Sequence, residues 1–139
     1  MKFNTYVNYG GNCAEALHYY EQHLGGKIVT ISTWAQSPMS PPPGLSADST
    51  IHARIIIGDT LLMASDAPTN QWEPMRSAYL TLGFDSNEET ERAYEALGEG
   101  GKIFMKLEET FFAHRFAMLQ DKFGANWMII HEKPMPGGV

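Results

Sequence analysis

Two histidines stand at matching places in the chain, and imidazole is the side chain best suited to proton transfer near neutral pH. His52 and His114 lie 62 residues apart, and each is followed seven residues later by an aspartate, Asp59 or Asp121. If both imidazoles face one site, they could act as proton donor and acceptor, or as two ligands of an unusual metal site. Alternatively, each imidazole lies at a strand end and hydrogen-bonds the backbone. The sequence leaves both interpretations open.

Further side chains have both a functional and a structural interpretation. Glu109 could act as a general acid or base, but it adjoins Glu108, and both carboxylates could simply be exposed. Trp127 could stack on a ligand, although a tryptophan in a terminal strand more often lies in the core. Ser65 and Asp66 end a predicted strand, where they could line a site or close a turn. The types and spacing alone do not decide between these alternatives.

The composition is that of an ordinary globular domain. The 139 residues include 43% hydrophobic and 19% charged residues, and the only cysteine, Cys13, excludes an intramolecular disulfide. The formal charge of −6, without a run of Lys or Arg, argues against a nucleic-acid partner. No apolar stretch approaches the ~20 residues of a membrane helix, and the first residues lack the apolar run of a signal peptide. We therefore expect a cytoplasmic protein with no membrane partner.

These side chains are positioned by strands and helices, which the first half of the chain is predicted to form in the order βαβββ. Residues 3–9 predict a strand, and Asn12 with Glu15 predicts a capping box for a helix whose apolar face recurs over residues 13–24. Glycines end this helix. Three strands then follow, over residues 28–33, 50–57 and 60–65.

The second part of the chain repeats this order. Ser86 and Glu89 predict a second capping box between a strand over residues 78–84 and a helix. The remaining strands are expected over residues 102–105, 114–119 and 126–131. The repetition predicts an internal duplication within one α+β domain, residues 1–139, with two βαβββ modules of about residues 1–68 and 76–133 and a tail over 134–139. Because one helix leaves a sheet face uncovered, we expect the sheets to curl around a central cleft that binds a small molecule.

The segment over residues 34–49 is long, polar and rich in proline. Proline lacks the amide donor that a sheet needs, so this segment is predicted to be a loop. Loops of this length are often lids or disordered segments. Its Trp34 could cover the cleft or pack on a second subunit.

The chain resembles the PhnB-like family of the vicinal-oxygen-chelate superfamily, which includes glyoxalases, bleomycin resistance proteins and dioxygenases. The resemblance rests on segments across residues 3 to 131: Gly11-Asn12-Cys13-Ala14-Glu15-Ala16, Tyr19-Tyr20, His52-Ala53, Ile57-Gly58-Asp59, Met63-Ala64-Ser65-Asp66, Glu109-Thr110-Phe111-Phe112-Ala113-His114 and Asp121-Lys122-Phe123-Gly124-Ala125-Asn126-Trp127-Met128-Ile129. It implies a glyoxalase-like fold. It also carries two labels, one for phosphonate utilisation and one reading 3-demethylubiquinone 3-methyltransferase-like. The glycine pairs at 10–11 and 25–26 are explained as turns beside a helix, so the sequence does not predict a methyltransferase.

Glyoxalase-type relatives hold a divalent metal with His, Glu or Gln side chains on the first and last strands of each half. On the matching strands of this chain, only His131 has a suitable side chain, whereas a catalytic metal needs about three protein ligands. We therefore predict no metal ligands and no cofactor. A divalent metal held by at least two of His52, His114, His131 and Glu109 is kept as the alternative.

The predicted function is small-molecule binding by a PhnB-like protein, with the metal-dependent lyase, isomerase or dioxygenase as one alternative and a non-catalytic drug- or metabolite-sequestering protein as another. The catalytic candidates are His52, His114 and Glu109. The ligand-binding candidates are Tyr6, Asn8, Trp34, Ser65, Tyr79, Thr81, Phe112 and Trp127. The resemblance also implies a homodimer. In support, the aromatic side chains of Trp34, Trp72 and Phe112 are expected to be exposed and to need a covering surface.

Overall fold

The computed structural model describes residues 1–134 and divides the chain into two compact units. The first unit is Met1–Pro74 and the second is Met75–Val139. The last residues of the predicted tail, 135–139, lie outside the described residues. In the described part, no helix is long and apolar enough to cross a membrane.

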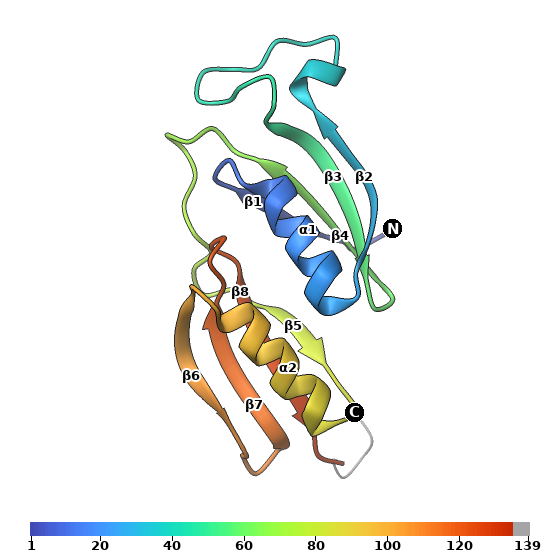
Figure 1. Ribbon diagram of the computed structural model, residues 1–139, viewed down its shortest axis with the longest axis vertical. Coiled ribbons are helices and arrows are strands. Elements are labelled where there is room, and N and C mark those ends of the chain that lie inside the picture. Colours follow the sequence, from blue (N-terminus) through green and yellow to red (C-terminus); the bar gives the residue numbers. More distant parts are fainter. Residues whose placement is uncertain (135–139) are drawn as a thin grey trace. The chain divides into compact units, whose positions relative to one another are not determined.

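The first unit is a four-stranded mixed sheet with one helix on one face (Figure 1). Its elements are β1 (Thr5–Tyr9), α1 (Cys13–Leu24), β2 (Lys27–Thr33), the short 3-10 helix η1 (Trp34–Gln36), β3 (Thr50–Ile57) and β4 (Thr60–Asp66). The strand order is β1-β4-β3-β2, with β1 parallel to β4 and the other neighbours antiparallel. The first strand of the unit, β1, therefore pairs with its last strand, β4. This pairing can form only after the rest of the unit has been placed between them in the chain.

The second unit repeats this arrangement, with its helix again lying across one sheet face (Figure 1). Its elements are β5 (Leu80–Gly83), α2 (Asn87–Gly98), β6 (Lys102–Glu108), β7 (Ala113–Gln120) and β8 (Asn126–Glu132). The strand order β5-β8-β7-β6 matches that of the first unit. The predicted order of two βαβββ repeats and the α+β class are thus confirmed, while β5 is shorter and β6 longer than predicted.

Each helix buries one apolar stripe against its own sheet. In the first unit, Leu17 and Tyr20 are fully buried on α1, and Tyr20 lies with its hydroxyl 3.1 Å from that of Tyr9 on β1. In the second unit, Ala93 and Leu97 of α2 are buried, as is Ile129 of β8. Since side chains alternate along a strand, every second strand residue points away from the helix, toward what we call the outward face of each sheet.

The predicted capping box at Asn12 is wrong. Asn12 makes no side-chain cap, and its Oδ1 is buried without a hydrogen-bond partner among residues 1–134. The carboxylate of Asp66, at the end of β4, caps α1 instead. Its Oδ1 accepts hydrogen bonds from the amides of Gly11 and Cys13 at 3.0 and 2.9 Å, and its Oδ2 accepts one from the Thr50 amide at 2.9 Å. Asp66 was considered for lining the site or for closing a turn after its strand, and the structure instead gives its carboxylate the role of capping α1.

The second helix is capped locally, as predicted. The Ser86 hydroxyl accepts a hydrogen bond from the Glu89 amide at 3.2 Å, the ordinary N-cap contact. The Glu89 carboxylate accepts a hydrogen bond from this hydroxyl at 3.1 Å rather than from the Ser86 amide. The two helices therefore begin in the same place in each repeat but are capped by different means.

Candidate functional site: the outward face of the first sheet

Strand register brings four of the predicted binding residues together on the outward face of the first sheet. Asn8 of β1 lies opposite Ser65 of β4, and the Ser65 hydroxyl donates a hydrogen bond to Asn8 Oδ1 at 3.0 Å. The Tyr6 hydroxyl lies 3.4 Å from His52 Nδ1, and the two rings are 5.9 Å apart between centroids. Tyr6, Asn8, His52 and Ser65 thus form one polar group of side chains.

This polar group points away from the core because its strand neighbours point into it. Val7 and Tyr9 on β1, Ala53 on β3 and Ala64 on β4 are all buried. Tyr6 and Asn8 are exposed, and His52 and Ser65 are half-buried. A hydroxyl beside an imidazole nitrogen can pass a proton to a ligand or take one from it, so the pair suits hydrogen bonding to a polar small molecule.

The side chain of Trp72, in the segment that follows β4, also contacts this group. The indole Nε1 of Trp72 donates a hydrogen bond to the Asn8 carbonyl at 3.1 Å, and its ring lies on Gly10. A Cβ atom at Gly10 would lie 2.7 Å from Trp72 Cδ2, so glycine is needed for this close approach. Trp72 is half-buried and is not the exposed aromatic that was expected.

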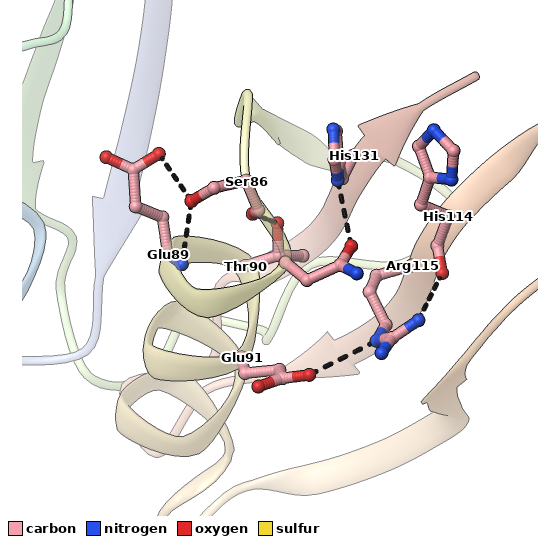
Figure 2. Close-up of polar contacts among 8 residues, drawn as sticks. Ser86, Glu89, Thr90, Glu91, His114, Arg115 and His131 are labelled. Carbon is pink, nitrogen blue, oxygen red and sulfur yellow. Dashed lines mark hydrogen bonds and ion pairs between the residues drawn. The ribbon is translucent and has the colours of Figure 1, made fainter.

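The second histidine occupies the equivalent strand position but has different surroundings. Ala53 pairs with Ala64 and Arg115 pairs with His131, which makes His52 and His114 equivalent by register. The register shifts between Ala113 and Arg115, at His114, and the imidazole of His114 lies 4.6 Å from that of His131. Figure 2 shows these two rings side by side. His131 Nδ1 also lies 2.9 Å from the Oδ1 of Asn87 on α2.

Ion pairs surround this second histidine pair. The Arg115 Nε lies 3.2 Å from Glu91 Oε1, and its Nη1 donates to the His114 carbonyl at 2.7 Å (Figure 2). Glu109 is exposed and lies 2.8 Å from Lys133 Nζ, and this hydrogen bond and charge lower the pKa of Glu109. A lowered pKa favours the ionised carboxylate, which works against the role of general acid that was considered for Glu109.

The other predicted binding residues are spread over both units. Trp127 is 2% exposed, and its Nε1 donates to the buried carboxylate of Asp121 at 2.8 Å, so its indole belongs to the core of the second unit. Phe112 is half-buried against Phe116, with the ring centroids 5.1 Å apart. Trp34, in η1, is half-buried, and its Nε1 has no hydrogen-bond partner among the described residues.

The first strand of the second unit does not bring Tyr79 and Thr81 to the positions that Tyr6 and Asn8 occupy in the first unit. Tyr6 pairs with Met63, and by equivalent register Gly83 pairs with Ile130, so the counterpart of Tyr6 is Gly83. Tyr79 precedes β5, and Thr81 is exposed opposite Met128. Tyr79 and Thr81 therefore do not repeat the positions of Tyr6 and Asn8.

The side chains at the strand positions where glyoxalase-type relatives hold a metal do not fit one. In the first unit the outward positions of β1 and β4 carry Tyr6, Asn8, Met63 and Ser65. In the second unit those of β5 and β8 carry Thr81, Gly83, Met128, Ile130 and, at the end of β8, Glu132. Catalytic divalent metals are usually held by about three imidazole and carboxylate ligands, whereas the first of these sets has none and the second has Glu132 alone. Over residues 1–134, no group of three or more His, Cys, Asp or Glu side chains could hold a metal.

Cys13 does not supply a nucleophile. Burial, followed by the nearby Asp66 charge, raises the pKa of its thiol to about 12, against a partial lowering by a hydrogen bond to Thr50. The thiol is therefore protonated at neutral pH, whereas thiol chemistry needs the thiolate.

One residue of the outward face was missed by the sequence analysis. Arg54 lies two positions after His52 on β3, opposite Met63 of β4 and Thr30 of β2. The alternation of side chains along a strand places it on the same face as His52, which was the signal available in the sequence.

Comparisons with known proteins agree with this architecture. The family model for the Glyoxalase/Bleomycin resistance protein/Dioxygenase superfamily matches residues 2–129. Protein YjdN of Escherichia coli (strain K12) is 32% identical over 145 residues, which cover 98% of this chain and 99% of that protein. The crystal structure of protein PA1353 from Pseudomonas aeruginosa is 38% identical with a TM-score of 0.86, covering 96% of this chain and 99% of that one. A putative 3-demethylubiquinone-9 3-methyltransferase, PhnB protein, from Bacillus cereus shares the fold at 24% identity, with a TM-score of 0.81 over 94% of this chain and 99% of that one.

Proposed function

This chain belongs to the glyoxalase/bleomycin resistance protein/dioxygenase superfamily as a PhnB-like member, and on that premise we propose that it binds a polar small molecule on the outward face of its first sheet. The observation that carries the proposal is the contact of the Tyr6 hydroxyl with His52 Nδ1, on a sheet face where Asn8 and Ser65 add further polar atoms. Small-molecule sites combine an accessible surface with a few convergent polar groups. These four residues supply donors and acceptors for such a ligand.

The proposal does not use a metal. Its ligand contacts come from hydroxyl, amide and imidazole groups, which form hydrogen bonds without a bound cation. The alternative, a metal-dependent lyase, isomerase or dioxygenase, requires stoichiometric metal. Elemental analysis of protein purified without chelator separates the two, since about one metal ion per chain would favour the alternative.

The binding test follows the backbone amides of the protein by NMR while a panel of small polar metabolites is added. We expect ligands to shift the amides of β1, β3 and β4, and we expect Tyr6→Phe and His52→Gln each to weaken binding about tenfold, because each removes a hydrogen bond to the ligand. His18→Gln is the matched control, because His18 is exposed on α1. A panel that shifts no amide on these strands, or equal weakening by the control, would contradict the proposal.

We further propose that the protein forms a homodimer through β6. This strand lies at the edge of its sheet and exposes Ile103, Phe104 and Met105 by 44%, 49% and 42%. Exposed apolar edge strands are templates for pairing with another chain. Lys102 and Glu108 are the two ends of β6, so antiparallel pairing with a second copy would set each lysine opposite a glutamate. This complementarity favours a second copy of the chain as the partner.

A further inference from the structure

Arg54 is the one arginine on the outward face of the first sheet, and its neighbours across the strands are polar or apolar but uncharged. Along the register, Arg54 lies between Thr30 of β2 and Met63 of β4, and Met63 pairs in turn with Tyr6 of β1. The neighbouring row of the same face contains Ser32, His52, Ser65 and Asn8. Arg54 therefore lies on the same face as the polar group that is proposed to bind the ligand, one row of residues away from His52 and Ser65.

Arg54 has no counter-charge, in contrast to the other half-buried cations. Of the ten Lys and Arg residues, Arg54, Arg115 and Lys133 are half-buried, and the rest are exposed. Arg115 is paired with Glu91 and Lys133 with Glu109. Arg54 makes no hydrogen bond and no ion pair with any residue that the structure describes. A bound anion would give the Arg54 guanidinium the hydrogen-bonded counter-charge that Arg115 and Lys133 find within the chain.

The four strands leave this face without a carboxylate. Their outward residues near Arg54 are hydroxyl, amide, imidazole, thioether and alkyl groups, and the nearest strand carboxylate, Asp66, is buried on the helix side and held by three backbone amides. The chain as a whole has a net charge of −6, with sixteen Asp and Glu residues. An outward sheet face bearing a cation and no acid is complementary to an anion rather than to a cation or a neutral molecule.

We propose that Arg54 binds an oxyanion group, a carboxylate or a phosphorus oxyacid, of the small molecule that occupies this face. The planar guanidinium presents paired N–H donors that match two oxygens of such a group. The Tyr6 hydroxyl and the His52 imidazole lie on the same face as donors for the remaining oxygens. The inference rests on the proposed function, because it assigns the ligand class of that same face.

The test measures the binding of acetate, methylphosphonate, inorganic phosphate and the uncharged acetamide by amide NMR shifts. We expect at least one of the three oxyanions to shift the amides of Arg54, Met63 and Tyr6, and acetamide to shift none of them. Arg54→Met should weaken oxyanion binding about tenfold or more, and Arg54→Lys less, because lysine keeps the charge but loses the paired donors. Arg92→Met is the matched control, since Arg92 is exposed on α2, and it should bind as the wild type does. The unshifted amide spectrum of each variant outside β3 checks its fold.

The outcomes separate this inference from the proposed function. Uncharged compounds of the metabolite panel could shift the amide signals of β1, β3 and β4 equally in wild type and Arg54→Met, while the oxyanions shift none of them. In that case the proposed binding face is supported and the role of Arg54 is overturned. The same holds if an oxyanion binds Arg54→Met as tightly as wild type. If no compound of either set shifts the face, both the proposed function and the oxyanion site are overturned.

Discussion

Asp66 is the single residue on which the geometry of the first unit depends most. Its carboxylate is 6% exposed and accepts hydrogen bonds from three backbone amides, two of them at the start of α1 and one at the start of β3. It therefore fixes three chain segments that lie far apart in sequence. Hydrogen bonds to a charged, buried acceptor are among the stronger ones in proteins.

Replacing this carboxylate with an amide gives a stability prediction. In Asp66→Asn, one of the two oxygens becomes an NH₂ group that faces a backbone N–H, so at least one buried amide loses its acceptor. We expect the free energy of unfolding to fall by about 2–4 kcal/mol, measured by urea denaturation. Asp48→Asn is the control, because Asp48 is exposed in the loop before β3, and it should change stability by less than about 0.5 kcal/mol. Equal effects of the two substitutions would refute the role given to Asp66.

At the scale of residues, the sequence indicated which candidate side chains share a sheet face, but it did not indicate which side chains contact one another. Tyr6, Asn8, His52 and Ser65 were recoverable from the sequence because alternation along strands places them on one face. The bulge that puts His114 beside His131 and the absence of a partner for Arg54 depend on side-chain contacts across strands. Such contacts have no local signature, and neither does the burial of Trp127 against Asp121.

At the scale of elements, the sequence predicted order and type well and helix caps only in part. Glycines, β-branched runs and helical periodicity are local signals, so all eight strands and both helices were recognised, with ends shifted by up to three residues. The box at Ser86 is also local and was confirmed. The capping box predicted at Asn12 is absent because the carboxylate of Asp66 accepts the hydrogen bond of the Cys13 amide instead. Asp66 lies 53 residues after Cys13, so the local pattern around Asn12 could not reveal it.

The two helix starts give a paired prediction. Ser86→Ala removes the acceptor for the Glu89 amide and should lower the free energy of unfolding by about 1 kcal/mol. Asn12→Ala removes a side chain that makes no cap and whose Oδ1 is buried without a partner in the described part of the chain. The substitution should therefore lower the free energy of unfolding by about 0.5 kcal/mol or less, or even raise it. Thermal or urea denaturation of both variants decides the matter, and a larger loss in Asn12→Ala than in Ser86→Ala would contradict the capping described for α1.

At the scale of the whole molecule, the two units keep a common plan but differ in what their outward faces carry. By register, Arg54 of the first unit corresponds to Phe116 of the second, and Met63 corresponds to Ile130. Tyr6 corresponds to Gly83. At Arg54 and Tyr6, a polar side chain of the first unit thus has a phenylalanine or a glycine as its counterpart. The helix sides differ as well, since the buried Ala53 and Ala64 correspond to Arg115 and His131. This divergence explains why the duplication is plain in the order of elements and faint in individual residues.

The proposed dimer yields a prediction at this scale. In sedimentation velocity at high protein concentration, the wild type should be a dimer, and Phe104→Lys should be a monomer, because it puts a charge into the proposed strand pairing. Val29→Lys is the matched control, since Val29 is 55% exposed on β2, the edge strand of the first sheet, and it should remain a dimer. A monomeric wild type, or the loss of the dimer in both variants, would argue against pairing through β6.

The capping of α1 by Asp66 also has a consequence for the emerging chain during synthesis. The ribosome synthesises the residues of the first helix long before it reaches position 66. Until then, the amides of Gly11 and Cys13 lack the carboxylate that accepts their hydrogen bonds in the folded unit. The second helix has no such delay, since Ser86 precedes the Glu89 amide that it caps. During translation, the N-terminal repeat therefore cannot complete its helix start until its last strand has been made, whereas the C-terminal repeat can begin its own at once.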